Sequence, residues 1–190
     1  IWATLILGLA GFLAVAWLVG SGFTETWDKA LLLSLRDAAN PSDAWGPPWF
    51  EEAAAEVSAL GGFTVLTIMC LLALGVLLLL RKRAAALFLL LATLLGGTAS
   101  TLLKLVFQRP RPDLVDHLDR TFTASFPSGH AMISMLTLLT LAAVAVRFIP
   151  HHAVRVFVVS CAIVLALLIG CTRVYLGVHW PSDVLAGWFL

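Results

Sequence analysis

Charged side chains are scarce in this chain. Asp, Glu, Lys and Arg make up 12% of the 190 residues, against roughly 25% in soluble domains. The formal net charge is only +1, which argues against a nucleic-acid partner, because such a partner requires a clustered basic face. The hydrophobic fraction is 61% and the mean hydropathy is +0.98. This balance predicts an integral membrane protein.

Cysteine is also rare and follows no pattern. Cys70, Cys161 and Cys171 lie in or at the ends of apolar runs and lack the spacing of metal ligands. We expect them to pack among apolar neighbours. The chain also lacks an internal repeat, a low-complexity tract and a linker, so a single domain over residues 1–190 is expected.

The ends of the sequence carry an expectation of their own. The chain starts at Ile1 and stops at Leu190 inside an apolar run, so we expect both ends to be trimmed. A signal peptide is not expected, because the first apolar run is about 20 residues long and has no small-residue cleavage site before it continues.

What the chain does contain is long apolar runs. A helix needs about 20 apolar residues to cross roughly 30 Å of hydrocarbon. Six runs qualify, so the fold class expected is all-α: a polytopic membrane bundle with six transmembrane helices. The predicted spans are Trp2–Val19, Gly62–Leu80, Ala84–Phe107, Gly129–Phe148, Val156–Cys171 and one that begins near Pro181.

The charges between the runs predict an orientation. Cations gather in residues 81–83 and 147–155, which link the second run to the third and the fourth to the fifth. By the positive-inside tendency these links are cytoplasmic. The segment Ser21–Gly61 is rich in Asp and Glu instead, so we place it outside.

The same outer segment is predicted to form two short interfacial helices. The first covers Glu25–Ala39, with apolar residues on roughly one face, and Asn40-Pro41 stops it. Pro47-Pro48 opens the second, which ends at Gly61-Gly62. The pair is either a connector that lies on the membrane or a rim that admits a lipid substrate sideways.

Three polar clusters interrupt the apolar sequence: Lys104–Pro112, Pro127–His130 and Thr172–Asp183. Charged and imidazole groups at membrane depth generally mark a functional site. In the predicted topology all three clusters reach the outer membrane face. They supply histidines, cations and a carboxylate, the groups needed to bind and cleave a phosphate.

Pro127–His130 stands where a loop turns into a helix. The backbone N–H groups of Ser128, Gly129 and His130 would then be the unpaired donors of a helix start, which binds anions. The alternative is that Ser128 is only an N-cap and Gly129 only a turn residue.

Thr172–Asp183 places a carboxylate four residues after an imidazole. Pro181 suits a first helical turn, so Asp183 could accept a hydrogen bond from one ring nitrogen of His179 and leave the other free to attack. Alternatively, Asp183 is a first-turn residue favoured by the helix dipole and His179 is incidental.

The cations around these histidines match a phosphate. A lysine point charge, Lys104, is combined with the forked donors of Arg109, Arg111 and Arg173. The alternative is that these side chains snorkel to the headgroups.

The combination of motifs resembles a known family. Lys104 is followed after six residues by Arg111-Pro112, then come Pro127-Ser128-Gly129-His130, and Arg173 precedes His179 by five intervening residues and Asp183 by three more. This closely resembles the three-part signature of the type 2 phosphatidic acid phosphatase (PAP2) superfamily, in particular its compact bacterial members. One departure is Thr172, where the family usually has Ser.

The resemblance implies a lipid phosphate phosphatase that needs no cofactor and no metal. His179, oriented by Asp183, would attack phosphorus and form a phosphohistidine, and His130 would protonate the leaving oxygen and then activate water. One neutral and one protonated histidine predict a bell-shaped pH profile. The phosphate-binding groups would be Lys104, Arg111, Ser128, Gly129 and Arg173.

The implied partners are a lipid phosphate substrate and membrane lipids, with no nucleic acid and no required protein partner. The implied location is the bacterial inner membrane, with the active site on the periplasmic face. The substrate stays open among phosphatidylglycerol phosphate, phosphatidic acid, undecaprenyl pyrophosphate and lipid A phosphate.

Two features invite other hypotheses. Asp113, Asp116, His117 and Asp119 suggest a metal site. We expect these residues to lie in an exposed polar loop without a catalytic metal, because the phosphate-binding residues already supply the positive charge that a metal would provide. Gly96-Gly97 predicts close helix packing, with a substrate groove as the alternative.

Two other function classes compete with the phosphatase. A non-catalytic phospholipid carrier or scaffold would need the cations but not His130, His179 and Asp183. A vanadate-dependent peroxidase has a similar site, but it is expected to be soluble, which the apolar composition disfavours.

Overall fold

The computed structural model describes residues 2–190, and these form helices without a β-strand, so the all-α class is confirmed for this part of the chain. The bounds are α1 Trp2–Gly20, α2 Glu25–Leu33, α3 Pro48–Leu60, α4 Phe63–Leu79, α5 Arg83–Phe107, α6 Gly129–Ala145, α7 His152–Tyr175 and α8 Pro181–Phe189.

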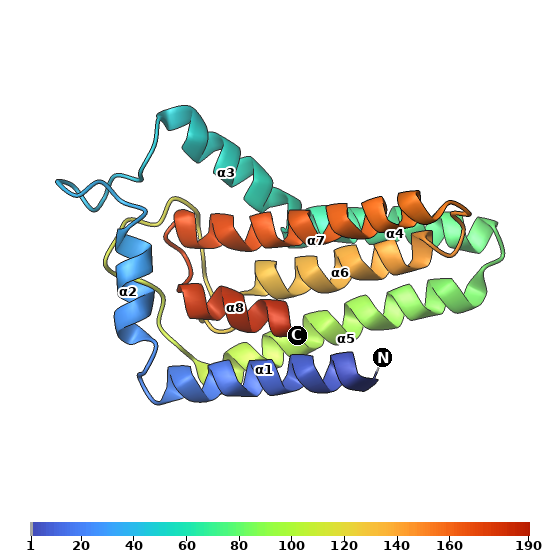
Figure 1. Cartoon of the computed structure of the whole chain (residues 1–190), viewed down its shortest axis with the longest axis horizontal. Helices are drawn as coiled ribbons and strands as arrows, with labels where there is room; N and C mark the ends of the chain where they lie inside the picture. Colours follow the sequence, from blue (N-terminus) through green and yellow to red (C-terminus); the bar gives the residue numbers. More distant parts are fainter. Residues whose placement is uncertain (1) are drawn as a thin grey trace.

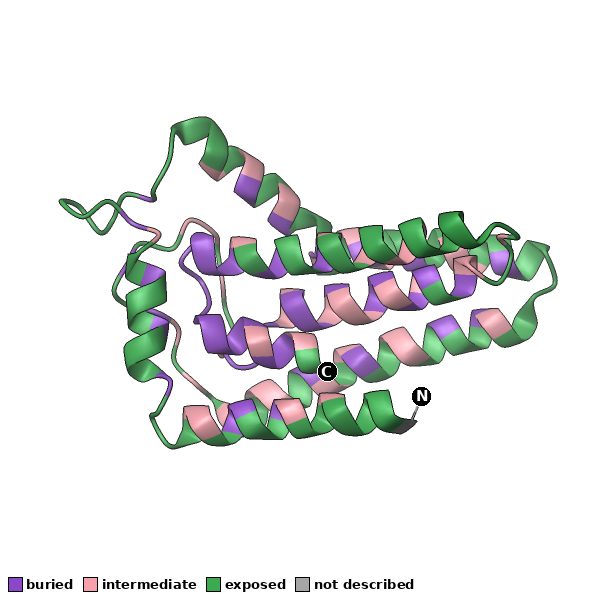
Figure 2. Cartoon of the chain, viewed as in Figure 1, coloured by how far each residue is buried: buried purple, intermediate pink, exposed green. Residues whose placement is uncertain are grey.

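Helix α6 lies at the centre of the bundle. It packs against α5, α7 and α8, while α1 packs against α8 and α3 against α7. Helix α2 lies across one end of the long helices (Figure 1). The buried faces of the helices point inward, and much of the outward surface is exposed (Figure 2). Large apolar residues such as Phe63 and Leu79 are among the exposed ones, as expected where lipid covers the protein.

Among the described residues, three helices are long and apolar enough to cross a membrane: α1, α5 and α7. Helices α3 and α4 form a fourth span if they are taken together across a 44° bend. Helix α6 has 17 residues and α8 has nine, and 17 residues correspond to about 25 Å. The count of six spans therefore stays a prediction.

The first interfacial helix is shorter than predicted. Helix α2 ends at Leu33, not at Ala39. Asp37 accepts hydrogen bonds from the backbone N–H groups of Ala39 and Asn40, which competes with helix formation. Arg36 then pairs with Ala44 in an isolated antiparallel bridge. Helix α3 agrees with its predicted bounds.

Two predicted spans also need correction. Helix α6 ends at Ala145, three residues before Phe148. Helix α7 begins at His152 and ends at Tyr175, so it extends beyond Val156–Cys171 at both ends. The hydropathy pattern excluded the first and last turns of α7, because these turns contain Arg155 and Arg173. The backbone nevertheless stays helical around both residues.

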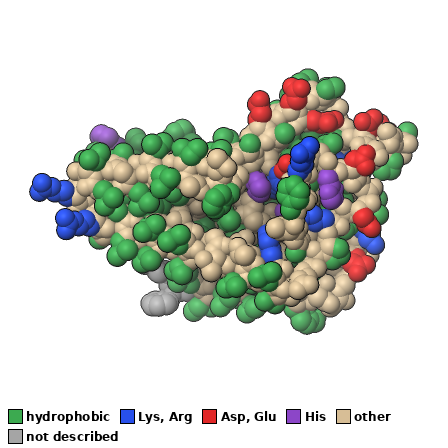
Figure 3. All heavy atoms as spheres, turned by 180° about the vertical axis from the view of Figure 1, so that it is seen from behind, with side chains coloured by type: hydrophobic (Ala, Val, Ile, Leu, Met, Phe, Trp, Pro, Cys, Tyr) green, Lys and Arg blue, Asp and Glu red, His purple; other side chains and the backbone are tan. Residues whose placement is uncertain are grey.

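The three polar clusters lie at one end of the bundle, as predicted. The segment 108–128, the start of α6, the end of α7 and the start of α8 meet there, together with α2 (Figure 1). Figure 3 shows Asp and Glu side chains gathered at this end, together with Lys, Arg and His, and further Lys and Arg side chains at the opposite tip. All acidic residues fall in residues 25–56 and 113–119 and at Asp183.

A backbone contact joins α8 to the start of α6. The N–H of Ser128 donates to the carbonyl of Asp183 at 3.0 Å. One turn further along α8, a Cβ atom on Gly187 would lie 2.9 Å from the Ser128 carbonyl oxygen and 3.1 Å from the Met132 nitrogen. Only glycine allows the two helices this approach.

The two glycines of α5 have different environments. A Cβ on Gly96 would lie 2.0 Å from the Leu136 side chain, so Gly96 allows close packing of α5 against α6, as predicted. Gly97 has open space instead. It lines a mostly apolar cavity of about 210 Å³ between α4, α5 and α6.

Candidate active site

His179 and Asp183 face each other at the start of α8. Trp180 is the N-cap, Pro181 lies in the first turn, and the Asp183 carboxylate reaches back to accept the Trp180 N–H at 2.9 Å. The Nδ1 atom of His179 lies 3.4 Å from Oδ2 of Asp183. The ring therefore turns Nδ1 to the carboxylate and leaves Nε2 directed elsewhere.

The Nε2 atom of His179 faces a cation. It lies 3.3 Å from Nη1 of Arg111. His179 is 2% exposed, and this burial lowers its pKa to about 4, although the nearby Asp183 acts to raise it. At neutral pH the imidazole is therefore uncharged, the form required of a nucleophile.

Arg111 and Lys104 are held by backbone carbonyl groups of the loop that follows α5 and of the segment between α7 and α8. Arg111 donates to the carbonyls of Val178 at 2.6 Å and Thr123 at 2.8 Å. Burial, and then the charge of Arg173, lower the pKa of Arg111 to about 10, so it stays cationic at neutral pH. Lys104 Nζ donates to the carbonyl of Ala124 at 2.6 Å.

Arg173 is the most buried cation of the site, with 2% exposure. Its Nη1 donates to Ser58 Oγ on α3 and to Asp119 Oδ2, both at 2.6 Å. Its Nε and the Oγ of Ser128 are buried without a hydrogen-bond partner among the described residues. Such unpaired donors at a cationic site suit phosphate oxygens.

His130 and Gly129 form the first turn of α6. His130 is half-buried and lines a cavity of about 420 Å³ together with Ser58 and Asp119. A Cβ on Gly129 would lie 3.6 Å from Cε of Lys104, so the helix start adjoins the lysine. The prediction of a free Ser128 N–H is wrong, because that group donates to Asp183; the N–H groups of Gly129 and His130 are the remaining first-turn donors.

Some contacts of the site residues were not predicted from the sequence. Asp119 was expected in an exposed loop, but it is only part-exposed and binds Arg173. Burial alone would raise the pKa of Asp119, but the hydrogen bond and charge of Arg173 lower it overall. Ser125 donates to Asp183. No local sequence signal identifies Asp119, Ser125 or Ser58, because each contact joins segments far apart in the chain.

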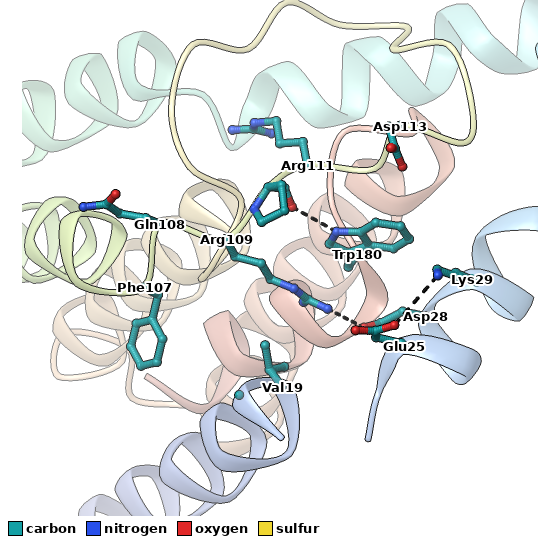
Figure 4. Close-up of a pocket in the computed structure, with 12 residues that line it drawn as sticks. Val19, Glu25, Asp28, Lys29, Phe107, Gln108, Arg109, Arg111, Asp113 and Trp180 are labelled. Carbon is teal, nitrogen blue, oxygen red and sulfur yellow. Dashed lines mark hydrogen bonds and ion pairs between the residues drawn. The ribbon is translucent and has the colours of Figure 1, made fainter. Parts of the chain in front are cut away.

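The structure brings the predicted site residues to one end of the bundle, but one of the cations binds carboxylates there. Arg109, grouped by sequence with the phosphate-binding cations, turns instead to Asp28 and Asp183. Figure 4 shows its guanidinium directed at Asp28 on α2, whereas Arg111 points elsewhere. His117 Nε2 lies 2.6 Å from the Pro112 carbonyl oxygen in its own loop, and because that oxygen can only accept, Nε2 carries the proton and donates.

Comparison with known proteins gives relatives for both the sequence and the fold. The chain is 37% identical over 92 residues to phosphatidylglycerophosphatase B of Bacillus subtilis, covering 47% of this chain and 44% of that protein. It is 39% identical over 66 residues to an undecaprenyl-diphosphatase of Sulfolobus acidocaldarius, covering 35% and 28%. The chain thus spans less than half the length of these curated relatives.

The fold comparison covers more of the molecule. A crystal structure of a transmembrane PAP2-type phosphatidylglycerolphosphate phosphatase from Bacillus subtilis matches with a TM-score of 0.85 and 27% identity, over 98% of this chain and 89% of that one. The model of the PAP2 superfamily matches residues 85–190, which include every predicted site residue. More than half of the chain therefore fits the family model, and the protein is an integral membrane member of the PAP2 superfamily.

Proposed function

We propose that the protein is a lipid phosphate phosphatase that hydrolyses a phosphomonoester or pyrophosphate through a phosphohistidine, without a metal. The observation that carries this proposal is the placement of the His179 ring, whose Nδ1 lies 3.4 Å from Oδ2 of Asp183 and whose Nε2 lies 3.3 Å from Nη1 of Arg111. A protein that only bound phospholipid would need the cations but not this nucleophile.

In the first step, Nε2 of His179 forms a bond to phosphorus and the bond from phosphorus to the lipid oxygen breaks. His130 gives its proton to that oxygen, and the negative charge of Asp183 stabilises the ring of His179 as it becomes charged. Cations and helix-start donors hold the remaining phosphate oxygens, where charge develops. These groups are Lys104, Arg111, Arg173, Ser128 and the Gly129 N–H.

In the second step, water attacks phosphorus and the bond to Nε2 breaks. His130, now neutral, takes a proton from the water, so both histidines return to their starting states when phosphate leaves. The placement of His130 beside Arg173 and Asp119 in one cavity supports this role, because a phosphate held by Arg173 would lie next to His130.

The setting of the site supports a membrane-borne substrate. We place the site on the periplasmic face of a bacterial inner membrane, since the end with the cationic links lies opposite to it. We treat residues 1–190 as one domain with six spans and no required protein partner. The names of the relatives favour phosphatidylglycerol phosphate and undecaprenyl pyrophosphate first among the four lipids considered.

The direct test is phosphate release by the purified protein in detergent with excess chelator. Phosphatidylglycerol phosphate, phosphatidic acid, undecaprenyl pyrophosphate and lipid A phosphate are offered in parallel. We expect release from at least one lipid at the same rate with and without chelator, because arginine, lysine and backbone donors replace a metal. Loss of activity in chelator that added Mg²⁺ restores would contradict the metal-free mechanism. No release from any lipid would favour a carrier.

The pH dependence should show two limbs. The pKa of His179 lies below its ordinary value of 6.5, at about 4. The neutral form is then present above this pH, and kcat/KM should fall as the pH drops through about 4. The basic limb, read from kcat, should follow loss of the His130 proton in the substrate complex, where the negative phosphate beside the ring favours its charged form. The ionisation of the substrate phosphate is measured separately by ³¹P NMR and divided out. A flat profile would contradict the pairing of one neutral and one protonated histidine.

A further inference from the structure

Arg109 lies between two buried carboxylates. Its Nη2 donates to Asp28 Oδ2 at 2.8 Å and its Nη1 donates to Asp183 Oδ1 at 2.6 Å. The Arg109 side chain is 14% exposed, while those of Asp28 and Asp183 are 1% and 0% exposed. The guanidinium also lies 5.7 Å from the centre of the Trp180 ring. Planar forked donors suit such a bridge, and a lysine could not reproduce it.

Asp28 caps the start of α8, although it belongs to α2. Its Oδ1 accepts the backbone N–H of Ser182 at 2.9 Å and its Oδ2 accepts the Ser182 hydroxyl at 2.6 Å. The first N–H groups of a helix have no partner within the helix, and a carboxylate stabilises that end. Ser182 also accepts from Arg109 at 2.8 Å, which closes the network.

This network fixes the rotation of the Asp183 carboxylate. One oxygen, Oδ1, is bound by Arg109. The other, Oδ2, accepts from Ser125 and from the Trp180 N–H, and it is the oxygen that faces His179. If Arg109 released Oδ1, only the two donors on Oδ2 would hold the carboxylate, and it could turn about Oδ2 and change its direction toward Nδ1 of His179.

We propose that Asp28 and Arg109 are positioning residues, which hold the Asp183 carboxylate against His179 and tie the interfacial helix α2 to the active site. Figure 4 shows the Asp28–Arg109 contact and places it on the α2 side of the site. The inference rests on the proposed function for its effect on turnover, but the placement of His179 can be measured without turnover.

Other charged groups also lie near His179, and each must stay unchanged in the test. Lys104, Arg111 and His130 act on its ring directly, and Arg173 and Asp119 lie beside His130. These groups come from α5, the following loop, α6 and α7.

The test compares Asp28→Asn and Arg109→Gln with a matched control on α2. Glu25 forms an exposed pair with Lys29, so Glu25→Gln removes a carboxylate from the same helix outside the network. We expect both network variants to lower kcat about 10- to 100-fold with KM changed less than about threefold, because misplaced reacting groups lose rate and not binding. Glu25→Gln should match the unsubstituted protein.

The second readout is the titration of His179, followed by NMR of histidine-labelled protein and identified by its loss in His179→Gln. Arg109→Lys keeps the cation near Asp183 but cannot bridge both carboxylates, so the Asp183 carboxylate can turn away from Nδ1 and the titration midpoint should fall. Asp28→Asn frees the guanidinium of Arg109 and leaves its charge less compensated, so the midpoint should fall in this variant too. General loosening of the structure would instead let water reach the buried ring, and the midpoint would then rise toward the ordinary value of 6.5.

Several outcomes would overturn the inference. One is an unchanged kcat and titration in both variants, and another is a raised KM with kcat preserved, which would mean that Arg109 binds substrate. A rise of the titration midpoint in both variants would also overturn it. If Arg109→Gln fails to fold, Arg109→Lys decides, since it keeps the cation and cannot bridge both carboxylates. A protein that releases no phosphate refutes the proposed function, and the titration then still decides the positioning of His179.

Discussion

Replacing His179 with glutamine should lower the rate of phosphate release by at least about 10⁴-fold, the scale seen when a catalytic nucleophile is removed. Glutamine fills most of the space of the imidazole but cannot form a phosphohistidine. The cations around the site remain, so the variant should still bind lipid phosphate. The measurement is inorganic phosphate in a single-turnover reaction, with lipid binding measured separately.

The control for this variant lies at the other end of the bundle. His152→Gln replaces an exposed histidine in the first turn of α7 and should leave turnover unchanged. Both proteins are first matched by melting temperature in the same detergent. If His179→Gln kept more than about a tenth of the rate, direct attack of water on the lipid would replace the covalent mechanism.

Replacing Arg173 with lysine should lower kcat/KM about 10²- to 10³-fold, the scale for loss of one preorganised donor at a developing charge. Lysine keeps the positive charge and can still pair with Asp119. It lacks the fork that lets Arg173 bind Asp119 and Ser58 through Nη1 while Nε stays available for a phosphate oxygen. Initial rates over a range of lipid concentrations give the value.

Arg147→Lys is the matched control, because Arg147 is exposed after α6, at the end of the bundle opposite to the site. It makes the same chemical change away from the site and should alter kcat/KM less than about twofold. Equal activity of Arg173→Lys and the control would mean that only the charge of Arg173 matters. The role of Arg173 as a forked phosphate donor would then be wrong.

The sequence predicts the helices well where apolar runs are long, as in α1, α4 and α5. The sequence-based prediction fails where polar side chains determine where a helix begins or ends. Asp37 ends the outer helix early by binding backbone N–H groups, and α7 continues through arginines that hydropathy excludes. The spacing of the motifs is sufficient to bring the predicted catalytic residues to one end of the bundle.

The roles of the two neighbouring arginines could not be predicted. Arg109 and Arg111 are two residues apart in a proline-rich stretch, where no periodic pattern assigns a direction to either side chain. In the structure Arg111 contacts His179 and Arg109 contacts Asp28. The difference depends on Asp28, whose own segment is about 80 residues away, and no local pattern contains that contact.

The close approach of α8 to α6 has a consequence for how the protein tolerates mutation. Asp183 and His130 belong to different helices, and the backbone contact at Gly187 sets how near these helices come. A methyl group at that position would meet backbone atoms, which cannot move aside as a flexible side chain can. In a screen for inactive variants, Gly187→Ala should therefore appear among the hits although residue 187 carries no chemistry. The distance between His130 and His179 therefore depends on Gly187, a residue without a side chain.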